Sequence, residues 1–234
     1  MLRKNHFLSA FILLSIFLGG CTVPKKVLVD SSVVSSDKTL LMMPMDVELY
    51  EIQAGGVQEP KAGWTQQAKQ NLDAAIRDYA SSRGLRIQTM PTDLAVNASE
   101  DMVQMQKLHA QVNQTIFLHN YTAFHLPTKY ADPDWVVGDY SKKLKELTGA
   151  DYGLYLHFRD SFSSSGRWVV LIAAAAAGVH LPGGAQISEA SMVDLSNGQV
   201  VWHSRLAKES GDLRKADSAA QSIQELMDNY QQQQ

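Results

Sequence analysis

The sequence predicts an α/β fold with a single domain, in which a mixed β-sheet packs against helices. Short apolar runs with the period of a strand alternate with longer segments whose apolar residues recur every three or four positions. Asn197-Gly198 lies between the last two apolar runs and predicts a β-hairpin, so those strands are antiparallel. A hydrophobic share of 45% and a charged share of 19% are typical of a globular protein.

The N-terminal region has the pattern of an export signal. Arg3 and Lys4 precede an apolar run at residues 7–18, and Gly19-Gly20 precede the single cysteine, Cys21. The apolar run is shorter than the ~20 residues that a membrane-spanning helix needs. The alternatives are that residues 7–18 are an uncleaved membrane anchor or that Cys21 is an ordinary thiol. We expect a signal peptide at residues 1–20, a lipidated tether at 21–37, an α/β periplasmic domain at 38–230 and a disordered tail at 231–234.

The domain begins with two extended segments. Residues 39–43 are an apolar run ended by Pro44, typical of a buried strand. Residues 46–52 alternate between apolar and acidic side chains and predict a half-exposed strand. We interpret its carboxylates as the solvent-facing side of that strand and not as a metal site; they are Asp46, Glu48 and Glu51. Residues 53–63 contain Gly55-Gly56 and Pro60 and predict a loop.

Two long helices and a strand follow. Apolar residues at helical spacing predict a helix from Trp64 to Gly84, and residues 85–88 alternate as a strand. Asn97 and Glu100 have the spacing of a capping box, which predicts the start of the second helix. Its apolar stripe consists of Met102, Met105, Leu108, Val112 and Ile116. His109 and His119 lie on or near this helix and His125 follows it. Their spacing does not suit a metal site, so we expect ordinary surface or loop histidines at these positions.

An aromatic segment at residues 121–135 is the first candidate contact surface. Its aromatic side chains either cover the core or form a recognition surface. They are Tyr121, Phe124, Tyr130 and Trp135. A short helix is predicted next, with Tyr140, Leu144 and Leu147 on its apolar side and Gly149 at its end.

Residues 151–159 form the clearest predicted strand. Tyr152, Leu154, Leu156 and Phe158 share one face, while Tyr155, His157 and Arg159 share the other. Further strands are predicted at residues 187–195 and 200–203, on either side of the Asn-Gly turn. An amphipathic helix closes the chain, with an apolar face of Leu213, Ala216, Ala220, Ile223, Met227 and Tyr230.

The insert at residues 168–181 is the second candidate contact surface. Trp168 begins a run of apolar residues that includes five consecutive alanines up to Ala177. We expect a buried or docking helix, and the alternatives are an arm that contacts a membrane or a partner and a hairpin of a pore. The absence of polar alternation argues against the hairpin.

Two stretches resemble known families. Leu18-Gly19-Gly20-Cys21 resembles the lipobox of bacterial lipoproteins, which implies acyl chains on the sulfur and the amine of Cys21. Thr22, in place of Asp, implies sorting to the outer membrane. In the second half, Gly149-Ala150-Asp151-Tyr152 and the hairpin at residues 192–202 resemble the family that includes the curli-secretion lipoprotein CsgG, the penicillin-binding-protein activator LpoB and the N-terminal domain of TolB. Ser196-Asn197 departs from the family's usual pattern.

Composition and motifs exclude several classes of function. The formal charge is −3, and loss of Arg3 and Lys4 with the signal peptide makes it more negative, which argues against nucleic-acid binding. The sequence has no Gly-x-Ser-x-Gly, His-Glu-x-x-His or phosphate-loop motif. His157 and Asp160 are three positions apart on a strand and therefore point to opposite faces. We expect no catalytic residue, metal or cofactor.

Together these features predict a lipid-anchored, non-catalytic binding or assembly protein that faces the periplasm from the outer membrane. It would contact the membrane through the lipid on Cys21 and an unidentified envelope protein through Tyr121, Phe124, Tyr130, Trp135 and Trp168. A homo-oligomer is compatible with the sequence. The alternatives are a subunit of an oligomeric CsgG-like export channel and, with the least support, an envelope hydrolase.

Overall fold

The structure is a computed structural model that describes residues 28–29, 38–91, 100–129, 134–209 and 211–228. Its strands are β1 (Leu28–Val29), β2 (Thr39–Met42), β3 (Asp46–Ile52), β4 (Gln58–Pro60), β5 (Arg86–Thr89), β6 (Tyr152–Ser163), β7 (Gln186–Asp194) and β8 (Val200–Lys208). Its helices are α2 (Ala62–Ser82), α4 (Glu100–Tyr121), α5 (Tyr140–Thr148), α6 (Ser165–Ala176) and α7 (Ala216–Met227), with a short 3-10 helix at Pro127–Lys129.

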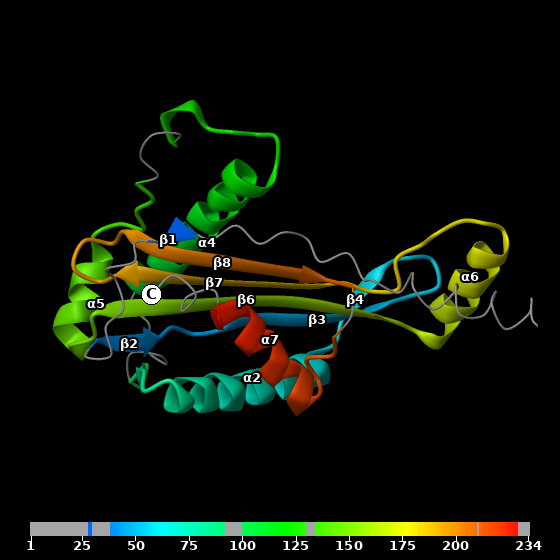
Figure 1. Cartoon of the computed structure of the whole chain (residues 1–234), viewed down its shortest axis with the longest axis horizontal. Helices are drawn as coiled ribbons and strands as arrows, with labels where there is room; N and C mark the ends of the chain where they lie inside the picture. Colours follow the sequence, from blue (N-terminus) through cyan, green and yellow to red (C-terminus); the bar gives the residue numbers. More distant parts are fainter. Residues whose placement is uncertain (1–27, 30–37, 92–99, 130–133, 210, 229–234) are drawn as a thin grey trace, which may run out of the picture.

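The described strands form one mixed sheet with the order β1-β8-β7-β6-β2-β5, and β3 joins β6 beyond the end of β2. β4 pairs with β3. Helices α2 and α7 lie on one face of the sheet and α4 lies on the other (Figure 1). This arrangement confirms the predicted α/β fold, the single domain, and the C-terminal hairpin followed by a helix.

The long strand β6 is the centre of the sheet. Its residues from Tyr152 to Asp160 pair with β7 in antiparallel register. Its other edge pairs in parallel with β2, where Leu40 lies opposite Tyr152, and then with β3, where Asp46 lies opposite His157. Pro44 lies between β2 and β3. Because proline has no N–H to donate, the ladder is interrupted there and resumes at Asp46.

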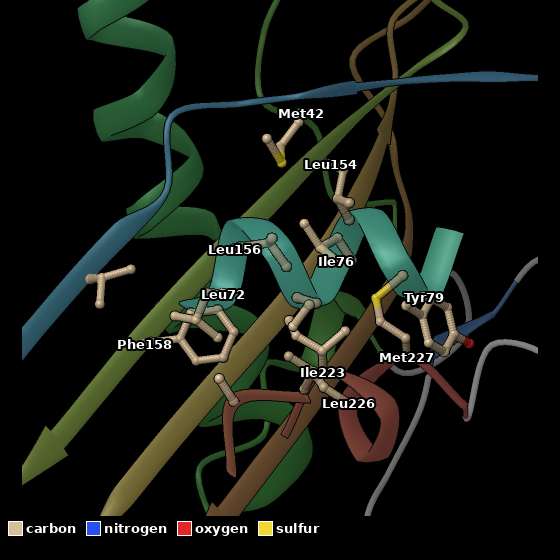
Figure 2. Packing of buried hydrophobic residues seen from close by; sticks show 14 of the residues in the cluster. Met42, Leu72, Ile76, Tyr79, Leu154, Leu156, Phe158, Ile223, Leu226 and Met227 are labelled. Carbon is tan, nitrogen blue, oxygen red and sulfur yellow. The ribbon is translucent and has the colours of Figure 1, made fainter. Parts of the chain in front are cut away.

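The main core lies between α2, α7 and the first face of the sheet (Figure 2). The apolar stripe of α2 and the buried face of α7 both face alternate residues of β6, which is the predicted face of that strand. In α7 the predicted Ile223 and Met227 are buried, whereas the predicted Ala216 and Ala220 are exposed. The contacting side chains shown are Leu72, Ile76 and Tyr79 of α2, Ile223, Leu226 and Met227 of α7, and Leu154, Leu156 and Phe158 of β6. Each large apolar side chain buried in this way contributes about 2 kcal/mol from the loss of apolar surface to water.

A second core fills the other face at the end of the sheet near α5. It joins Met102, Met105 and Ile116 of α4 to Leu144 of α5 and Tyr155 of β6. Helix α5 ends as predicted at Gly149, whose φ of 71° is left-handed and whose N–H donates to the Lys145 carbonyl at 2.7 Å.

Within the described residues, no helix is long and apolar enough to cross a membrane.

The predicted Asn-Gly hairpin between β7 and β8 is confirmed. The Gly198 N–H donates to the Asp194 carbonyl at 2.8 Å, and the Gly198 carbonyl accepts from Val137 N–H at 2.8 Å. Gly198 has a φ of +77°, and a Cβ at this position would lie 2.5 Å from the Gly138 carbonyl oxygen. The turn therefore needs glycine for its backbone conformation and for the close approach of the segment before α5.

Two predictions of irregular structure are corrected. The expected loop at residues 53–63 contains β4, which returns along β3 with Tyr50 opposite Pro60. The expected tether contains β1, in which Leu28 pairs with His203 and Val29 with Trp202 of β8. Both strands are too short to show a periodic pattern, so only the sheet edge beside them orders them. The rest of the tether, with Cys21, and the Asn97 capping box lie outside the described residues.

Candidate functional site

Helix α6 projects past the end of the sheet, away from α5 (Figure 1). None of its residues is buried. The side chains of Trp168, Val169 and Ile172 are 56%, 68% and 68% exposed. The buried form of the expected buried or docking helix is therefore wrong, whereas a docking helix stays a prediction. The segment is a helix and not the alternative hairpin of a pore. The physical reason is that the connection from β6 to β7 leaves the sheet beyond the two helix-covered cores, where no described element covers it.

Hydrogen bonds attach to the sheet both the start of α6 and the segment that follows it. Ser164 caps the helix by accepting from Arg167 N–H at 3.2 Å, and its own N–H donates to the Ile52 carbonyl at 2.9 Å. In the segment that leads from α6 to β7, the Gly183 carbonyl accepts from the Ser163 hydroxyl at 2.6 Å. These hydrogen bonds attach α6 and the segment after it to β3 and β6. They therefore hold the exposed apolar surface of α6 in place relative to the sheet.

The aromatic segment divides between core and surface. Phe124 is 76% exposed, whereas Trp135 is 5% exposed and belongs to the second core. Tyr121, at the end of α4, is partly buried, and burial raises the pKa of its hydroxyl to about 12. Tyr130 lies outside the described residues. Among the described aromatic residues of this segment, Phe124 is therefore the most exposed and the most available to a partner.

Trp135 shows how this segment is attached. Its carbonyl accepts from Val200 N–H at 2.8 Å, and Val136 forms an isolated antiparallel bridge to Gln199. The ammonium group of Lys129 lies 5.1 Å from the centre of the Trp135 ring. The ring therefore covers the hairpin end of the core, which is the core-covering interpretation considered from the sequence.

The prediction of surface histidines is wrong for two of the three. His109 and His119 on α4 are buried, at 8% and 7% exposed, while His125 is exposed. The His109 ring stacks on Tyr155 with 3.7 Å between ring centres, and its Nε2 lies 2.6 Å from Ser191 Oγ. His119 Nδ1 accepts from Leu126 N–H at 2.9 Å. Helix α4 buries polar side chains because the sheet face below its middle is itself polar.

That polar face contains a row of four charged or titratable side chains, one from each of four neighbouring strands. Asp46 of β3 lies opposite His157 of β6, His157 opposite Glu189 of β7, and Glu189 opposite Arg205 of β8. We call these four residues the polar row. His157 Nε2 lies 3.7 Å from Asp46 Oδ2 and its Nδ1 lies 3.7 Å from Glu189 Oε2, while Arg205 forms an ion pair with Glu189. Asn113 of α4 covers the row and donates to Glu189.

Burial keeps the histidines of this region neutral. It lowers the pKa of His109 to about 3 and that of His203 to about 4, with smaller contributions from neighbouring cations and histidines. Burial also lowers the pKa of His157, although Glu189 and Asp46 act in the opposite direction. At neutral pH these rings therefore act as neutral hydrogen-bonding groups and not as cations.

The polar row was not predicted as a unit. The two faces of β6 were assigned correctly. The signal at Glu189 and Arg205 is a charged residue in the middle of a strand. That signal gives the face of each residue but not its neighbours on the other strands, since strand register pairs residues as far apart in the sequence as Asp46 and His157.

The fold does not bring His157 and Asp160 together. His157 lies on the α4 face, whereas Asp160 lies on the other face and accepts from Leu213 N–H at 3.1 Å. These two side chains therefore point apart, as predicted. The described part of the chain also has no group of three His, Cys, Asp or Glu side chains arranged to hold a metal ion.

Comparisons with known proteins find a distant likeness of fold. No protein-family model matches the chain, and no curated protein matches its sequence. Among solved structures, a PelC dodecamer from Paraburkholderia phytofirmans has 11% identity and a TM-score of 0.36, covering 87% of this chain and 96% of that one. Lipoprotein GNA1162 from Neisseria meningitidis has 14% identity and a TM-score of 0.33, covering 82% and 94%.

The C-terminal domain of LpoB from Salmonella enterica has 12% identity and a TM-score of 0.28, covering 76% of this chain and 86% of that one. Proteins described as bacterial lipoproteins are thus among the structures with a similar fold. At these identities and scores the likeness concerns the fold alone. The resemblance to CsgG and TolB, which was based on the hairpin residues, stays a prediction.

Proposed function

We propose that this chain is a lipid-anchored, non-catalytic binding protein of the outer membrane that faces the periplasm and assists the assembly or activity of an envelope complex. The anchor would be the acylated Cys21 that the Leu18-Gly19-Gly20-Cys21 motif implies. Acyl chains hold a protein on a membrane at ~0.8 kcal/mol per buried methylene, and the anchored domain then meets membrane partners at high local concentration.

The observation that carries the proposal is the exposed apolar surface of α6. From Trp168 to Val179 the sequence has no charged residue, and Trp168, Val169 and Ile172 are all more than half exposed. Burying each of these side chains against a partner would contribute about 2 kcal/mol. Exposed apolar surface of this kind marks an interaction site more often than an accident of folding.

The direction of β1 supports a position of α6 near the anchor. Because β1 is antiparallel to β8, the chain followed back from Leu28 toward Cys21 leaves β1 in the direction of Lys208. That is the end of the sheet from which α6 projects (Figure 1). Six residues lie between Cys21 and Leu28, and the seven steps from one to the other span at most about 25 Å when fully extended. A partner bound to α6 would therefore lie close to the membrane surface.

Crosslinking in intact envelopes, followed by capture of this chain, tests the proposal. Trp168→Glu and Ile172→Glu place a charge on α6, and Leu147→Glu is the matched control, since Leu147 is 51% exposed on α5 at the opposite end of the sheet. We expect all three variants to fold like the parent, and only the α6 variants to lose the crosslinked partner. Retention of the same partner by both α6 variants would contradict the proposal. Phe124→Ser tests the aromatic segment in the same way.

The anchor and the oligomeric state have separate tests. We expect Cys21→Ser to remain unprocessed and to lose the outer-membrane fractionation of the parent. Size measurement of the detergent-extracted parent then distinguishes a small accessory protein from a large ring. A ring would favour the export-channel alternative.

A further inference from the structure

Helix α6 has an inner side and an outer side. Leu171 lies beside Gly183 in the segment that leads to β7, so this side of the helix faces the rest of the protein. Residues three or four positions apart share a helix face, which places Trp168, Ile172 and Ala176 together on another side. All three of these residues are exposed, and Trp168 and Ile172 are more than half exposed. We call these three residues the outer stripe.

Side-chain size changes along α6. The first half contributes the large side chains of Trp168 and Ile172, whereas residues 173–177 are all alanines. This gradient makes the helix complementary to a copy of itself that runs in the opposite direction, because large side chains then face small ones along the whole length. A copy in the same direction would bring indole against indole and leave a gap between the alanines, and such gaps lose packing contacts.

No charge on the outer stripe would repel a second copy. Residues 168–179 contain no charged residue. The nearest cation is Arg167, whose Nη1 lies 3.5 Å from the Ala54 carbonyl oxygen and therefore points back toward the protein. Two outer stripes can consequently meet without bringing like charges together and without burying an ion.

The placement of α6 suits two copies on one membrane. The helix turns away from the direction of the strands, at the end of the sheet that leads toward Cys21 (Figure 1). Two copies anchored side by side are related by a two-fold axis along the membrane normal, and helices that lie across such an axis meet antiparallel. Two helices of 12 residues bury less than the roughly 1,200 Å² of a stable complex in solution, so the pair depends on the high local concentration that anchoring gives.

We propose that the partner of α6 is a second copy of this chain, with the two helices antiparallel and Ile172 at the two-fold axis. Trp168 of each copy then lies against Ala176 of the other. This inference rests on the proposed function, because it needs the anchor that brings two copies onto one membrane, and it names the partner that the surface of α6 takes there.

Cysteine crosslinking in intact envelopes tests the pair, with copper phenanthroline as the oxidant and non-reducing electrophoresis as the measurement. The sequence has one cysteine, so a chain acylated at Cys21 carries no thiol except the one introduced. Ile172→Cys places two thiols at the axis. We expect at least about tenfold more disulfide-linked dimer than from Leu147→Cys, which is exposed at the opposite end of the sheet.

Two further variants test the antiparallel register. In the proposed pair the two copies of residue 168 are eight helical steps apart, or about 12 Å along the helix, which exceeds the roughly 7 Å between Cα atoms that a disulfide spans. Trp168→Cys and Ala176→Cys should therefore form little dimer when each is expressed alone. Expressed together with tags of different size, they should link to each other about as well as Ile172→Cys links to itself. A parallel pair would give the reverse pattern.

Two results would overturn the pair. One is the absence of a dimer from Ile172→Cys in a variant that unfolds at the temperature of the parent, which would leave lipid or another envelope protein as the occupant of α6. The other is self-linking of Trp168→Cys at the level of Ile172→Cys. If Ile172→Cys failed to fold, the mixed Trp168→Cys and Ala176→Cys experiment would decide alone.

The result is separable from that of the proposed function. Loss of another crosslinked protein by Trp168→Glu, without a disulfide dimer from Ile172→Cys, would uphold the proposed function and reject the pair. A disulfide dimer from Ile172→Cys, with another crosslinked protein retained by both α6 variants, would do the reverse. A disulfide dimer of the parent would show a free thiol at Cys21 and would reject the anchor on which both proposals rest.

Discussion

His109 Nε2 of α4 and Ser191 Oγ of β7 lie 2.6 Å apart, and both side chains are buried. This contact, with the stacking of His109 on Tyr155, fixes the middle of α4 over the polar face of the sheet. It adds to the apolar contacts that Met102, Met105 and Ile116 of α4 make in the second core, so it should contribute measurably to stability.

His109→Phe tests this contact. Phenylalanine keeps a ring against Tyr155 but leaves the buried Ser191 hydroxyl without its partner, so the free energy of unfolding should fall by about 1–2 kcal/mol. Urea denaturation measures the change. In a double-mutant cycle, Ser191→Ala removes the stranded hydroxyl, and the double variant should lose less stability than the sum of the single changes. Strict additivity would show that the contact contributes nothing.

Buried neutral histidines predict a loss of stability in acid. His109 and His203 have pKa values of about 3 and about 4 in the folded protein, below the ordinary value of 6.5. The unfolded chain therefore binds more protons below pH 6.5, and each histidine lowers the free energy of unfolding by roughly 1.4 kcal/mol per pH unit down to its folded pKa. Urea midpoints measured between pH 7 and pH 4 should show this decline.

His203→Leu is the variant for this effect. Both ring nitrogens of His203 lack a hydrogen-bond partner among the described residues, and the side chain has no exposed surface. The variant should match or exceed the parent at pH 7 and lose less stability on acidification. A pH profile identical to that of the parent would contradict the assignment.

Asp160 acts in the opposite direction. Burial raises its pKa to about 7, against the hydrogen bonds from Leu213 N–H and Ser161 N–H, which lower it. The folded protein then holds a proton that the unfolded chain releases above pH 3.8, so this carboxyl destabilises the fold as the pH rises toward 7. Asp160→Asn should raise the free energy of unfolding at pH 8 by about 2 kcal/mol and steepen the decline in acid. Unchanged stability at pH 8 would mean that the native carboxylate is well solvated.

Substitution of two glycines by alanine distinguishes the cost of a steric clash from the cost of a left-handed backbone. Gly198 and Gly178 have nearly equal φ values of +77° and +76°. A Cβ on Gly198 would lie 2.5 Å from the Gly138 carbonyl oxygen, whereas a Cβ on Gly178 would meet nothing within 4 Å. Gly178→Ala should therefore cost about 1 kcal/mol from the left-handed backbone alone, and Gly198→Ala about 2 kcal/mol more. Equal losses in thermal unfolding would show that the segment before α5 simply moves aside.

Local patterns were sufficient where one element decides its own structure. The alternation in β6 predicted both of its faces, because successive side chains of any strand point to opposite sides. The Asn197-Gly198 turn and the end of α5 at Gly149 were predicted from glycine, and both glycines have the left-handed backbone angles that glycine adopts without strain. Trp64 to Gly84 likewise delimited α2 to within two residues at each end.

Local sequence patterns gave wrong predictions where a segment far away in the chain decides whether a residue is buried. The apolar stripe of α4 correctly included Met102, Met105 and Ile116, but His109 looked like a surface residue because nothing local reveals that Tyr155 and Ser191 lie below it. The five alanines of the insert suggested a buried helix for a similar reason. Composition predicted the helix, but only the path of the chain decided that α6 would lie beyond the sheet.

The sequence by itself predicted the order of the strands and helices other than β1 and β4, and it predicted the antiparallel C-terminal hairpin. Its N-terminal pattern leads us to expect an export signal and a lipid anchor at Cys21. Only the tertiary structure decided that Asp46, His157, Glu189 and Arg205 lie side by side and that Trp168 is exposed. The physical reason is range. Strand alternation and glycine angles act over a few residues, whereas strand register and the packing of a helix depend on segments far apart in the chain.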